Sequence, residues 1–585
     1  MIGKLLTHGT LSEENLHMAK NLYHAKFENK LPLGGIATGH INLGCDGSIT
    51  AKAPAFFVIK AEKDGELFDA RILQSSFDGD ISLPCFENSV PSSFFPFTEI
   101  CFSDSSFPAD VKMTSFSPFI PLNDTDSGIP AVCFELEVTS KVQDRIDYSV
   151  CLVSENLNEN AYNRMGCTDT GEAYIHFSGY GENSANSCIA TGGKNVSFCE
   201  YIKSDDDIIS NFTKNETLCN KTKSECNAPF SGGALSIHFS LGCGEREKTV
   251  FCLSWYNPIG ELSRNYYAQY FESALEAASY FLRQYDRLYS SSLEFAQYIS
   301  GATLPETVIE SVNSDLFSLT QKNLIRLDDG TLITGRISAS DGKDAVTNLF
   351  PDLAYSEIEY FYSSGRYENA SDDEKLTAVL RSRLKYTLTG DTDALIEDWY
   401  YIVKCLESVF GEDGKKECKQ NKELLRDALE AALILAQAVR DKKREELYSS
   451  ALQSFPLCQV SMDLGFANGY EKIHSISGFE YDAVKKHIGF NPDSEGCPLD
   501  TGGTFRCFFC TPTGYGYVEE GIDYVEINLL HGTLTLRSFG VPRMPRLVQY
   551  GGRNWKFAND NLNCILDSDL EVTPQKKLTI LIDIK

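Results

Sequence analysis

The spacing of apolar residues changes once along this chain of 585 residues, close to Tyr266, and that change limits the folds open to it. Before Tyr266, short segments alternate apolar and polar residues between turns rich in Gly, Asn, Asp and Ser, which is typical of a β-sandwich. After it, apolar residues recur every three or four positions, which is the period of a helix. We therefore predict a multi-domain α and β protein: an N-terminal β-sandwich over residues 1–260, a helical linker over 261–300 and an α-helical domain over 301–585 with C-terminal strands.

The N-terminal domain is expected to follow a helical lead-in over residues 1–30 and to contain one irregular part. Residues 183–228 are dense in Asn, Ser, Lys and Cys, and we predict a long surface insertion there. Strands are predicted at His40–Leu43, Ile49–Lys52, Ala55–Ala61, Thr98–Phe102, Ala109–Thr114, Ala131–Val138, Ile146–Val153, Ala173–Phe177, Gly233–Phe239 and Lys248–Trp255.

The second domain is expected to contain paired helices, as in an α-barrel or α-solenoid, although no fixed repeat is visible. Leu425, Leu429 and Ala436 repeat at the spacing of a buried helix face. After Gln459 the pattern returns to strands, which suits a helical barrel only if those strands form a hairpin layer packed on it. Helices are predicted at Pro305–Thr320, Asp373–Leu388, Asp393–Val409, Lys422–Val439 and Lys442–Ser454, and late strands at His487–Phe490, Gly503–Thr511, Tyr524–Leu530, Thr533–Ser538 and Lys577–Ile584.

Charge and cysteine content narrow the classes of partner. Acidic residues number 82 and basic residues 53, so the net charge of −29 at pH 7 repels the phosphate backbone of nucleic acids.

Nineteen cysteines cannot all pair within one chain, and residues 1–16 lack the apolar core of an export signal, so we predict reduced thiols and a cytoplasmic protein. No apolar run reaches the length of a membrane span. With nine histidines and no His-x-x-x-His pattern, we expect no metal site, and we expect no cofactor.

Two proline- and glycine-rich stretches of the first domain are distinctive together. Residues 32–39 read PLGGIATG, and residues 116–130 read FSPFIPLNDTDSGIP, an ordered turn between two strands. Both resemble the N-terminal domain of glycoside hydrolase family 116, the family of bile-acid β-glucosidase and non-lysosomal glucosylceramidase, in a shortened member of the bacterial type. The resemblance implies a β-sandwich, a reduced (α/α)6-type helical barrel and retaining β-glucosidase chemistry.

Further segments resemble the same family in the same order along the chain. They are Trp255, Tyr270, TLPE (303–306), LDDGT (327–331), LFPDL (349–353), LTGD (388–391), Trp399, GFEYD (478–482) and residues 506–516. The first four resemble the entry into the catalytic barrel, the next three resemble barrel helices, and the last two resemble the C-terminal end of bacterial members.

The catalytic residues of that family have no counterpart at the expected positions of this sequence. A retaining glycosidase uses two carboxyl groups about 5–5.5 Å apart, one as nucleophile and one as general acid and base. Without a gap, Arg336 stands where the resemblance places the nucleophilic Glu, and an arginine cannot act as a nucleophile. The Thr-Tyr-Asp motif of the acid/base is not found in residues 410–421, and the substrate-holding Glu and Arg have no match between Ser454 and His474. The catalytic residues are therefore left unknown.

A rewired active site would need other carboxylates, and the sequence does not place any two of them at a given separation. Asp328-Asp329-Gly330 and Glu412-Asp413-Gly414 are more simply turns, and Glu357 is expected on a solvated helix flank. The candidates are Asp328, Asp329, Asp341, Asp344, Glu357, Glu412 and Asp413.

Two other groups of residues could take part in metal binding, redox chemistry or sugar binding. Cys507 and Cys510 form a CxxC pattern in an apolar strand without a companion pair, which favours buried structural thiols over a zinc or redox site. Tyrosines can stack on pyranose rings, although most are expected in the core. The candidates are Tyr266, Tyr267, Tyr360, Tyr362, Tyr400 and Tyr401.

These patterns predict a glycoside-hydrolase-like protein, related to retaining β-glucosidases and glucosylceramidases, with a degenerate or absent pair of catalytic carboxylates. Its expected partner is a β-glucoside or other carbohydrate. The alternative is a non-catalytic carbohydrate-binding or assembly protein. The oligomeric state is left open.

Overall fold

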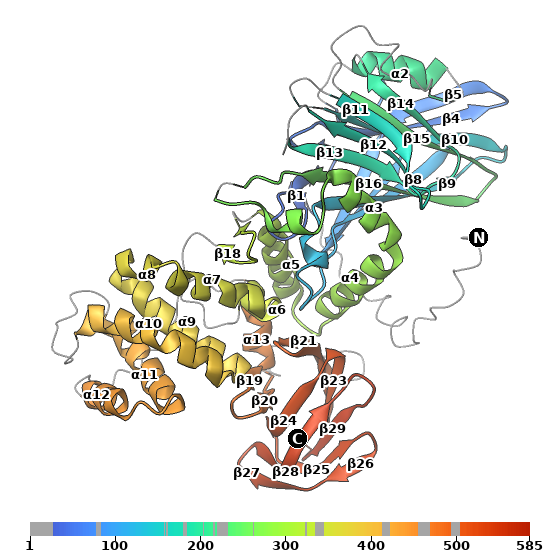
Figure 1. Ribbon diagram of the computed structural model, residues 1–585. Helices are drawn as coiled ribbons and strands as arrows, with labels where there is room; N and C mark the ends of the chain where they lie inside the picture. The colour runs from blue at the N-terminus through green and yellow to red at the C-terminus, as the bar shows by residue number, and fades with distance from the viewer. Residues whose placement is uncertain are drawn as a thin grey trace. The chain divides into compact units, whose positions relative to one another are not determined.

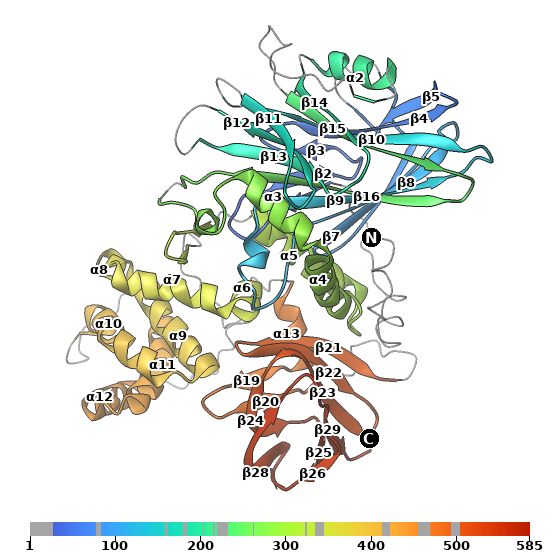
Figure 2. The ribbon, with the colours of Figure 1, turned by 45° about the vertical axis from the view of Figure 1, so that its right-hand side comes forward.

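The computed structural model describes residues 27, 29–77, 83–156, 158, 162–179, 184–202, 204–214, 217–218, 232–260, 262–321, 324–333, 344–411, 422–453, 469–492 and 503–584 (Figures 1 and 2). The chain groups into two compact units. The first comprises Met1–Ser300 and Leu316–Asp329, and the second comprises Gly301–Asp315 and Gly330–Lys585. The helical lead-in predicted at residues 1–30 lies almost wholly outside the described residues.

The first unit is a sandwich of two eight-stranded antiparallel sheets, as predicted (Figure 2). Phe57 of one sheet packs against Phe134 and Phe251 of the other, with ring centres 5.3 and 5.4 Å apart. One sheet has the order β1-β2-β3-β4-β10-β15-β14, with β5 paired to β4, and the other has the order β11-β12-β13-β16-β9-β8-β7-β6. The first sheet contains β1 (Lys30–Leu33), β2 (Ile41–Gly44), β3 (Ile49–Thr50), β4 (Ala55–Lys63), β5 (Glu66–Ile72), β10 (Ile146–Glu155), β14 (Val196–Ile202) and β15 (Gly232–Leu241). The second contains β6 (Asn88–Phe94), β7 (Phe97–Ser103), β8 (Ala109–Phe116), β9 (Ala131–Ser140), β11 (Tyr162–Cys167), β12 (Ala173–Ser178), β13 (Asn186–Thr191) and β16 (Arg246–Tyr256).

The predicted surface insertion over residues 183–228 is wrong for its described part. β13 lies between β12 and β16, and β14 pairs with β15 at the end of the first sheet. Helix α2 (Asp205–Lys214) packs on that sheet through Ile208, Ile209 and Phe212, all of which are buried. The composition of this segment concealed two strands: β14 buries every second side chain over Ser197–Tyr201, and β13 buries all of Cys188–Thr191.

The change of period near Tyr266 marks the end of the strands and the start of the helices. A short 3-10 turn, η4 (Tyr266–Gln269), precedes α3 (Ala274–Arg283) and α4 (Tyr285–Ser300). The side chain of Ser273 accepts a hydrogen bond from the backbone N–H of Glu276 and so caps α3. Ala274, Ala277 and Phe281 of α3 are fully buried in a core that includes residues of β9 and β16. Residues 274–300 are therefore largely helical, as the change of period predicted.

The second unit contains a group of packed helices. α9 (Asp372–Thr389) contacts α7 (Pro351–Ser363), α10 (Thr392–Phe410) and α11 (Lys422–Ala438), while α12 (Lys442–Gln453) packs on α11. Leu425, Leu429 and Ala436 are buried on the face of α11 that their spacing predicts. A closed barrel of the (α/α)6 type is not confirmed by the described helices. α5 (Glu306–Gln321) contains residues of both units, and β17 (Ile325–Arg326) belongs to the first unit. The short elements of the second unit are α6 (Ala345–Leu349), α8 (Arg366–Asn369), α13 (Glu471–Ser477) and β18 (Leu332–Ile333).

The stretch LTGD at 388–391 has a local physical role in this unit. Gly390 ends α9 with a φ of +68°, a left-handed conformation that glycine adopts without strain. Asp391 then accepts hydrogen bonds from the backbone N–H groups of Asp393 and Ala394, each at 3.0 Å, and caps α10. These residues turn the chain back between two packed helices.

The last strands form two sheets instead of the single hairpin layer that we expected. The five-stranded sheet has the order β19-β20-β24-β28-β27 and the six-stranded sheet the order β21-β22-β23-β29-β25-β26. Val525, Ile527 and Leu529 of β23 are buried and alternate with residues of more polar type, which places the apolar core on one face. The strands are β19 (Glu480–Asp482), β20 (His487–Gly489), β21 (Phe505–Thr511), β22 (Gly514–Glu520), β23 (Tyr524–Gly532), β24 (Leu534–Gly540), β25 (Pro545–Tyr550), β26 (Arg553–Trp555), β27 (Phe557–Asp560), β28 (Asn563–Val572) and β29 (Leu578–Ile582).

Two properties predicted from composition can be compared with the described residues. The cysteines among them are free thiols. No helix in this part of the chain has both the length and the apolar character needed to cross a membrane.

Candidate functional site

The stretch at 116–130 is an ordered loop that is held by Asp126. Asp126 is buried and accepts hydrogen bonds from Arg287 Nη1 at 2.7 Å, Tyr280 Oη at 2.8 Å and Asn123 Nδ2 at 2.7 Å. Burial alone would raise the pKa of Asp126, but the hydrogen bonds and the charge of Arg287 outweigh it and hold that pKa below its ordinary value. The loop is thereby fixed to α3 and α4.

The neighbouring Asp124 belongs to a second group of side chains. Asp124 forms an ion pair with Arg326 of β17, and the guanidinium carbon of Arg326 lies 3.5 Å from the centre of the Tyr266 ring. The hydroxyl oxygens of Tyr266 and Tyr270 are 2.7 Å apart. Burial and the hydrogen bond to Tyr270 raise the pKa of Tyr266 to about 12, so this phenol stays neutral at pH 7. We call Asp124, Tyr266, Tyr270 and Arg326 the tyrosine–arginine cluster.

The predicted turn at Asp328–Gly330 lies directly after Arg326. Asp328 and Asp329 are exposed, and Gly330 has a φ of +94°, so the turn is confirmed. The backbone N–H of Asp328 donates to Ser263 Oγ at 3.4 Å. The structure therefore joins three segments that the sequence singled out: the loop at 116–130, the residues around Tyr266 and the LDDGT stretch.

The chemistry of the tyrosine–arginine cluster suits a polyhydroxylated ligand. Its members supply a carboxylate acceptor, guanidinium donors and phenol hydroxyls that both donate and accept. The Tyr270 side chain is 47 % exposed, so its ring remains accessible to the C–H face of a sugar. Arg326 was not predicted as a site residue, and the available signal was a charged residue between Ile325 and Leu327 in an otherwise apolar stretch.

Tyr267, the neighbour of Tyr266, has a structural role. It is buried, its hydroxyl donates to the carbonyl of Asn257 at 2.9 Å, and that hydroxyl accepts from the backbone N–H of Asn257 at 3.0 Å. Of these two successive tyrosines, Tyr267 therefore lies in the core and Tyr266 belongs to the tyrosine–arginine cluster.

The tyrosines of the helical group are not brought together as a binding groove. Tyr362 is buried, lies 2.9 Å from Ser382 Oγ through its hydroxyl, and stacks on Tyr401 with ring centres 5.5 Å apart. Tyr360 is half-buried, and Tyr400 is 59 % exposed on α10. These contacts agree with the expectation that most tyrosines are structural.

The described carboxylate candidates of the second unit have structural environments. Asp344 caps α6 by accepting from the backbone N–H of Thr347 at 3.0 Å, and its carboxylate lies 3.8 Å from Arg381 Nη1. The prediction that Glu357 is solvated is wrong, because its side chain is only 7 % exposed. The helical phase of α7 places Glu357 on the same buried stripe as Leu353 and Phe361, which the acidic composition of the segment concealed.

Several residues of the predicted chemistry lie outside the described residues. They are Arg336, Asp341, Glu412 and Asp413, together with residues 454–468.

Cys507 and Cys510 are buried on β21, as predicted. Both are free thiols, and burial raises the pKa of the Cys510 thiol. Such thiols are poor nucleophiles because the reactive species is the thiolate. Among the described residues, no group of three or more His, Cys, Asp or Glu side chains is arranged to hold a metal ion.

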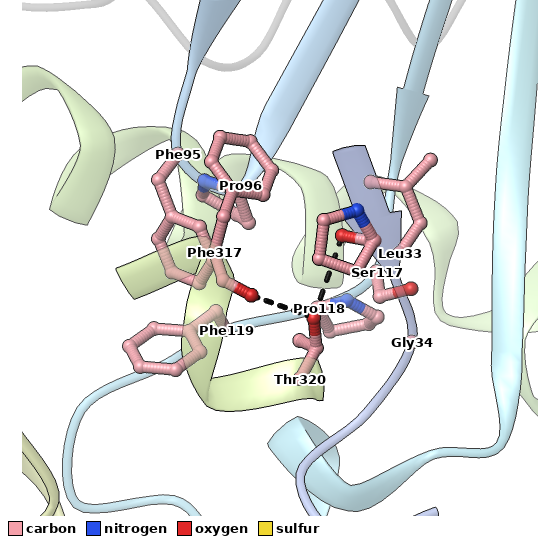
Figure 3. Close-up of a pocket in the computed structure, with 10 residues that line it drawn as sticks. Leu33, Gly34, Phe95, Pro96, Ser117, Pro118, Phe119, Phe317 and Thr320 are labelled. Atoms are coloured by element: carbon pink, nitrogen blue, oxygen red, sulfur yellow. Dashed lines mark hydrogen bonds between the residues drawn. The ribbon is translucent and has the colours of Figure 1, made fainter. Parts of the chain in front are cut away.

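Figure 3 shows a small cavity in the first unit that is lined in part by the start of the loop at 116–130. Its volume is about 10 Å³, which is room for a single water molecule. Its one threonine hydroxyl, on Thr320, already donates to the carbonyl of Phe317 at 2.8 Å. The cavity is therefore a packing defect and cannot accept a sugar. Its lining residues are Pro32, Leu33, Gly34, Phe95, Pro96, Ser117, Pro118, Phe119, Phe317 and Thr320.

The family resemblance of the first unit is supported by a comparison with known families. Residues 31–288 match the model of the family described as beta-glucosidase 2, glycosyl-hydrolase family 116 N-term. These residues, which make up less than half of the chain, are similar to that N-terminal domain. The match includes Asp124, Tyr266 and Tyr270 of the cluster and ends before Arg326.

Comparison with curated proteins finds no match. Among solved structures, a chain from the human microbiome described as a kojibiose phosphorylase is 8 % identical over 94 % of this chain and 99 % of that chain, with a TM-score of 0.35. A family GH92 glycosyl hydrolase is 9 % identical over 74 % of this chain and 63 % of its own, with a TM-score of 0.32. The family GH92 α-mannosidase BT3965 of Bacteroides thetaiotaomicron is 8 % identical over 73 % and 63 %, with a TM-score of 0.24. At these scores the neighbours carry no argument about function.

Proposed function

We propose that this protein is glycoside-hydrolase-like, that it binds a β-linked glucoside at the tyrosine–arginine cluster, and that it has lost the carboxylate pair that would cleave the bond. The observation that carries the proposal is the convergence of the 116–130 loop, Tyr266, Tyr270 and Arg326 in a unit that matches the family 116 N-terminal domain.

The environments of the described carboxylate candidates support the loss of catalysis. A retaining mechanism needs one carboxylate free to attack and a second able to donate a proton, at about 5–5.5 Å. Asp344 is committed to capping α6, while Asp328 and Asp329 lie in an exposed turn. Glu357 is held in the packed face of α7. The arginine at position 336, where the family pattern has its nucleophile, supports the same conclusion.

The domain boundaries at 260 and 300, a reduced (α/α)6-type helical domain, relation to glucosylceramidases and a bacterial origin are part of this proposal. The cytoplasmic location that the sequence predicts stays a prediction.

The proposal is tested with the full-length protein and a soluble aryl β-glucoside. We expect the glucoside to bind, as measured by calorimetry, without release of the aryl group. Tyr270→Ala removes the exposed ring of the cluster, and we expect it to weaken binding by about tenfold. Tyr400→Ala removes a similarly exposed ring from α10 and serves as the matched control, with binding unchanged.

Release of the aryl group at a rate above that of buffer would overturn the loss of catalysis. Equal binding by the wild type and Tyr270→Ala would overturn the assignment of the site. If no glucoside binds, the assembly role becomes the better explanation.

A further inference from the structure

One exposed side of helix α10 combines apolar and charged residues. The side chains of Ile396 and Tyr400 are 56 % and 59 % exposed and lie four residues apart, so they are neighbours on one face of the helix. The Tyr400 ring centre lies 5.4 Å from that of Tyr401 and 5.9 Å from the ammonium nitrogen of Lys404, and both contacts hold the exposed ring in place. Glu397 is exposed beside this pair. We call Ile396, Glu397, Tyr400 and Lys404 the α10 face.

The α10 face is not needed for the core of the second unit. The opposite side of α10 supplies Leu395, Ile402 and Leu406 to the buried core of the helical group, where α10 packs mainly on α9. Single exposed apolar residues are common on protein surfaces, but here two large ones lie side by side. Adjacent apolar side chains with charged residues at both ends indicate a contact surface for another molecule.

The charges on α10 run from acidic to basic along the helix. Asp393 and Glu397 are exposed in its N-terminal half. Lys404 lies in its C-terminal half and donates to Glu407 at 2.9 Å, and Arg444 of α12 donates to the same carboxylate at 2.9 Å. A second α10 helix in the antiparallel direction would therefore bring its basic end against this acidic end. The two helix dipoles would also oppose each other in that arrangement.

We infer that the α10 face binds a second copy of this chain, with the two helices antiparallel about a twofold axis at Tyr400. Residues that lie equally far before and after the axis face each other, so Lys404 faces Ile396 and Glu397 of the other copy. The twofold axis repeats each contact, and the two Tyr400 rings pack at the centre. Lys404 has three donor hydrogens and a side chain that is 43 % exposed, so it can pair with Glu407 and with the other copy's Glu397 together. A partner of a single charge sign would match only one end of the α10 face.

The test is sedimentation velocity of the full-length protein over a concentration series at 0.15 M salt, where exposed charges more than about 8 Å apart are largely screened. We expect a reversible equilibrium between monomer and dimer. Tyr400→Glu places two like charges at the centre of the contact, and we expect it to raise the dissociation constant more than about tenfold. Ile522→Glu, at a 68 % exposed position in the turn between β22 and β23, is the matched control and should leave the equilibrium unchanged.

Charge reversal tests the antiparallel arrangement. Lys404→Glu and Glu397→Lys each set like charges against each other, and each should raise the dissociation constant about tenfold. The double variant restores the pair with the signs exchanged, and its dissociation constant should return toward that of the wild type.

A wild-type protein that stays monomeric throughout the series would overturn the inference, as would equal association by the wild type and Tyr400→Glu. Loss of the dimer in Ile522→Glu would place the contact on the C-terminal sheets and refute it too. A double variant as weak as the single variants would contradict the antiparallel contact. The inference does not depend on the proposed function, so Tyr270→Ala should associate as the wild type does.

Discussion

Replacing Asp126 by asparagine tests how the 116–130 loop is held. Asp126 Oδ2 accepts from Asn123 Nδ2 and Arg287 Nη1, each at 2.7 Å, and Oδ1 accepts from Tyr280 Oη at 2.8 Å and Arg287 Nη2 at 3.1 Å. An asparagine has one acceptor oxygen, so two of these four hydrogen bonds lose their acceptor, one of them to a charged donor.

The size of the effect follows from those two bonds. A hydrogen bond to a charged group contributes about 1.5–3 kcal/mol and a neutral one about 1 kcal/mol. The Arg287 side chain is 43 % exposed, so water replaces part of the lost contact. We therefore expect Asp126→Asn to lower the free energy of unfolding of the first unit by about 2 kcal/mol at pH 7.

The effect should depend on pH with a definite sign. The pKa of Asp126 is lowered in the folded protein, so its charge stabilises the fold above the pKa of the unfolded chain, and this stability is lost as the pH falls through the lower folded value. The difference between wild type and Asp126→Asn should therefore shrink as the pH is taken below about 4.

Urea unfolding can follow the first unit alone. The chain has three tryptophans, and Trp399→Phe with Trp555→Phe leaves Trp255 of the sandwich as the sole reporter. In this background Asp124→Asn, at a half-exposed position of the same loop, is the control and should cost less than Asp126→Asn. An Asp126→Asn variant as stable as the wild type at pH 7, or a difference that grows on acidification, would refute the reasoning.

Three other predictions address the rest of the chain. Iodoacetamide at pH 8 should label the exposed Cys167 and Cys243 in the folded protein. It should spare the buried Cys133 and Cys252, because burial raises the pKa of both thiols. Peptide mass spectrometry identifies the labelled cysteines, and early labelling of Cys252 would contradict the prediction. Burial and the charge of Lys60 lower the pKa of His238 to about 4, so on acidification the unfolded chain takes up a proton at a higher pH than the folded protein does. The free energy of unfolding should therefore fall as the pH is lowered from about 6.5 to 4. His238→Gln should flatten this pH dependence in urea unfolding, and an unchanged slope would count against it. Leu435→Ala should lower the free energy of unfolding of the second unit by about 2–5 kcal/mol, measured by calorimetry, because Leu435 is fully buried in the helical core; an equal effect from the partly buried Leu433→Ala would contradict this.

The sequence predicted elements well where local pattern and packing agree. The period of residues 422–439 predicted α11 and its buried Leu425 and Leu429, because an apolar stripe at helical spacing has one stable arrangement. It also predicted the sandwich strands, such as β9, in which the buried Phe134, Leu136 and Val138 alternate with more polar residues at the period of a strand.

The predictions were wrong where they used the amino-acid composition of a segment without the position of each residue around the helix or along the strand. The polar residues of 183–228 concealed β14, in which only every second side chain is buried, and β13, in which the short run Cys188–Thr191 is buried. The acidic stretch around Glu357 was interpreted as solvated, yet the turn of α7 places that residue on the buried stripe. Both errors come from counting residue types without asking which face each occupies.

The candidate site depended on contacts between distant segments, which a single sequence does not specify. Tyr266, Tyr270 and the 116–130 loop were singled out separately, but nothing in their spacing indicated that Arg326 would stack on Tyr266 and pair with Asp124.

One measurement tests the central claim, binding without cleavage, most directly. Saturation-transfer NMR on methyl β-glucoside mixed with the full-length protein reports contact with the sugar, and the anomeric proton in the same spectra reports cleavage. We predict saturation transfer to the glucoside and no appearance of free glucose during prolonged incubation. Anomeric signals of free glucose, or an absence of transfer, would contradict the account.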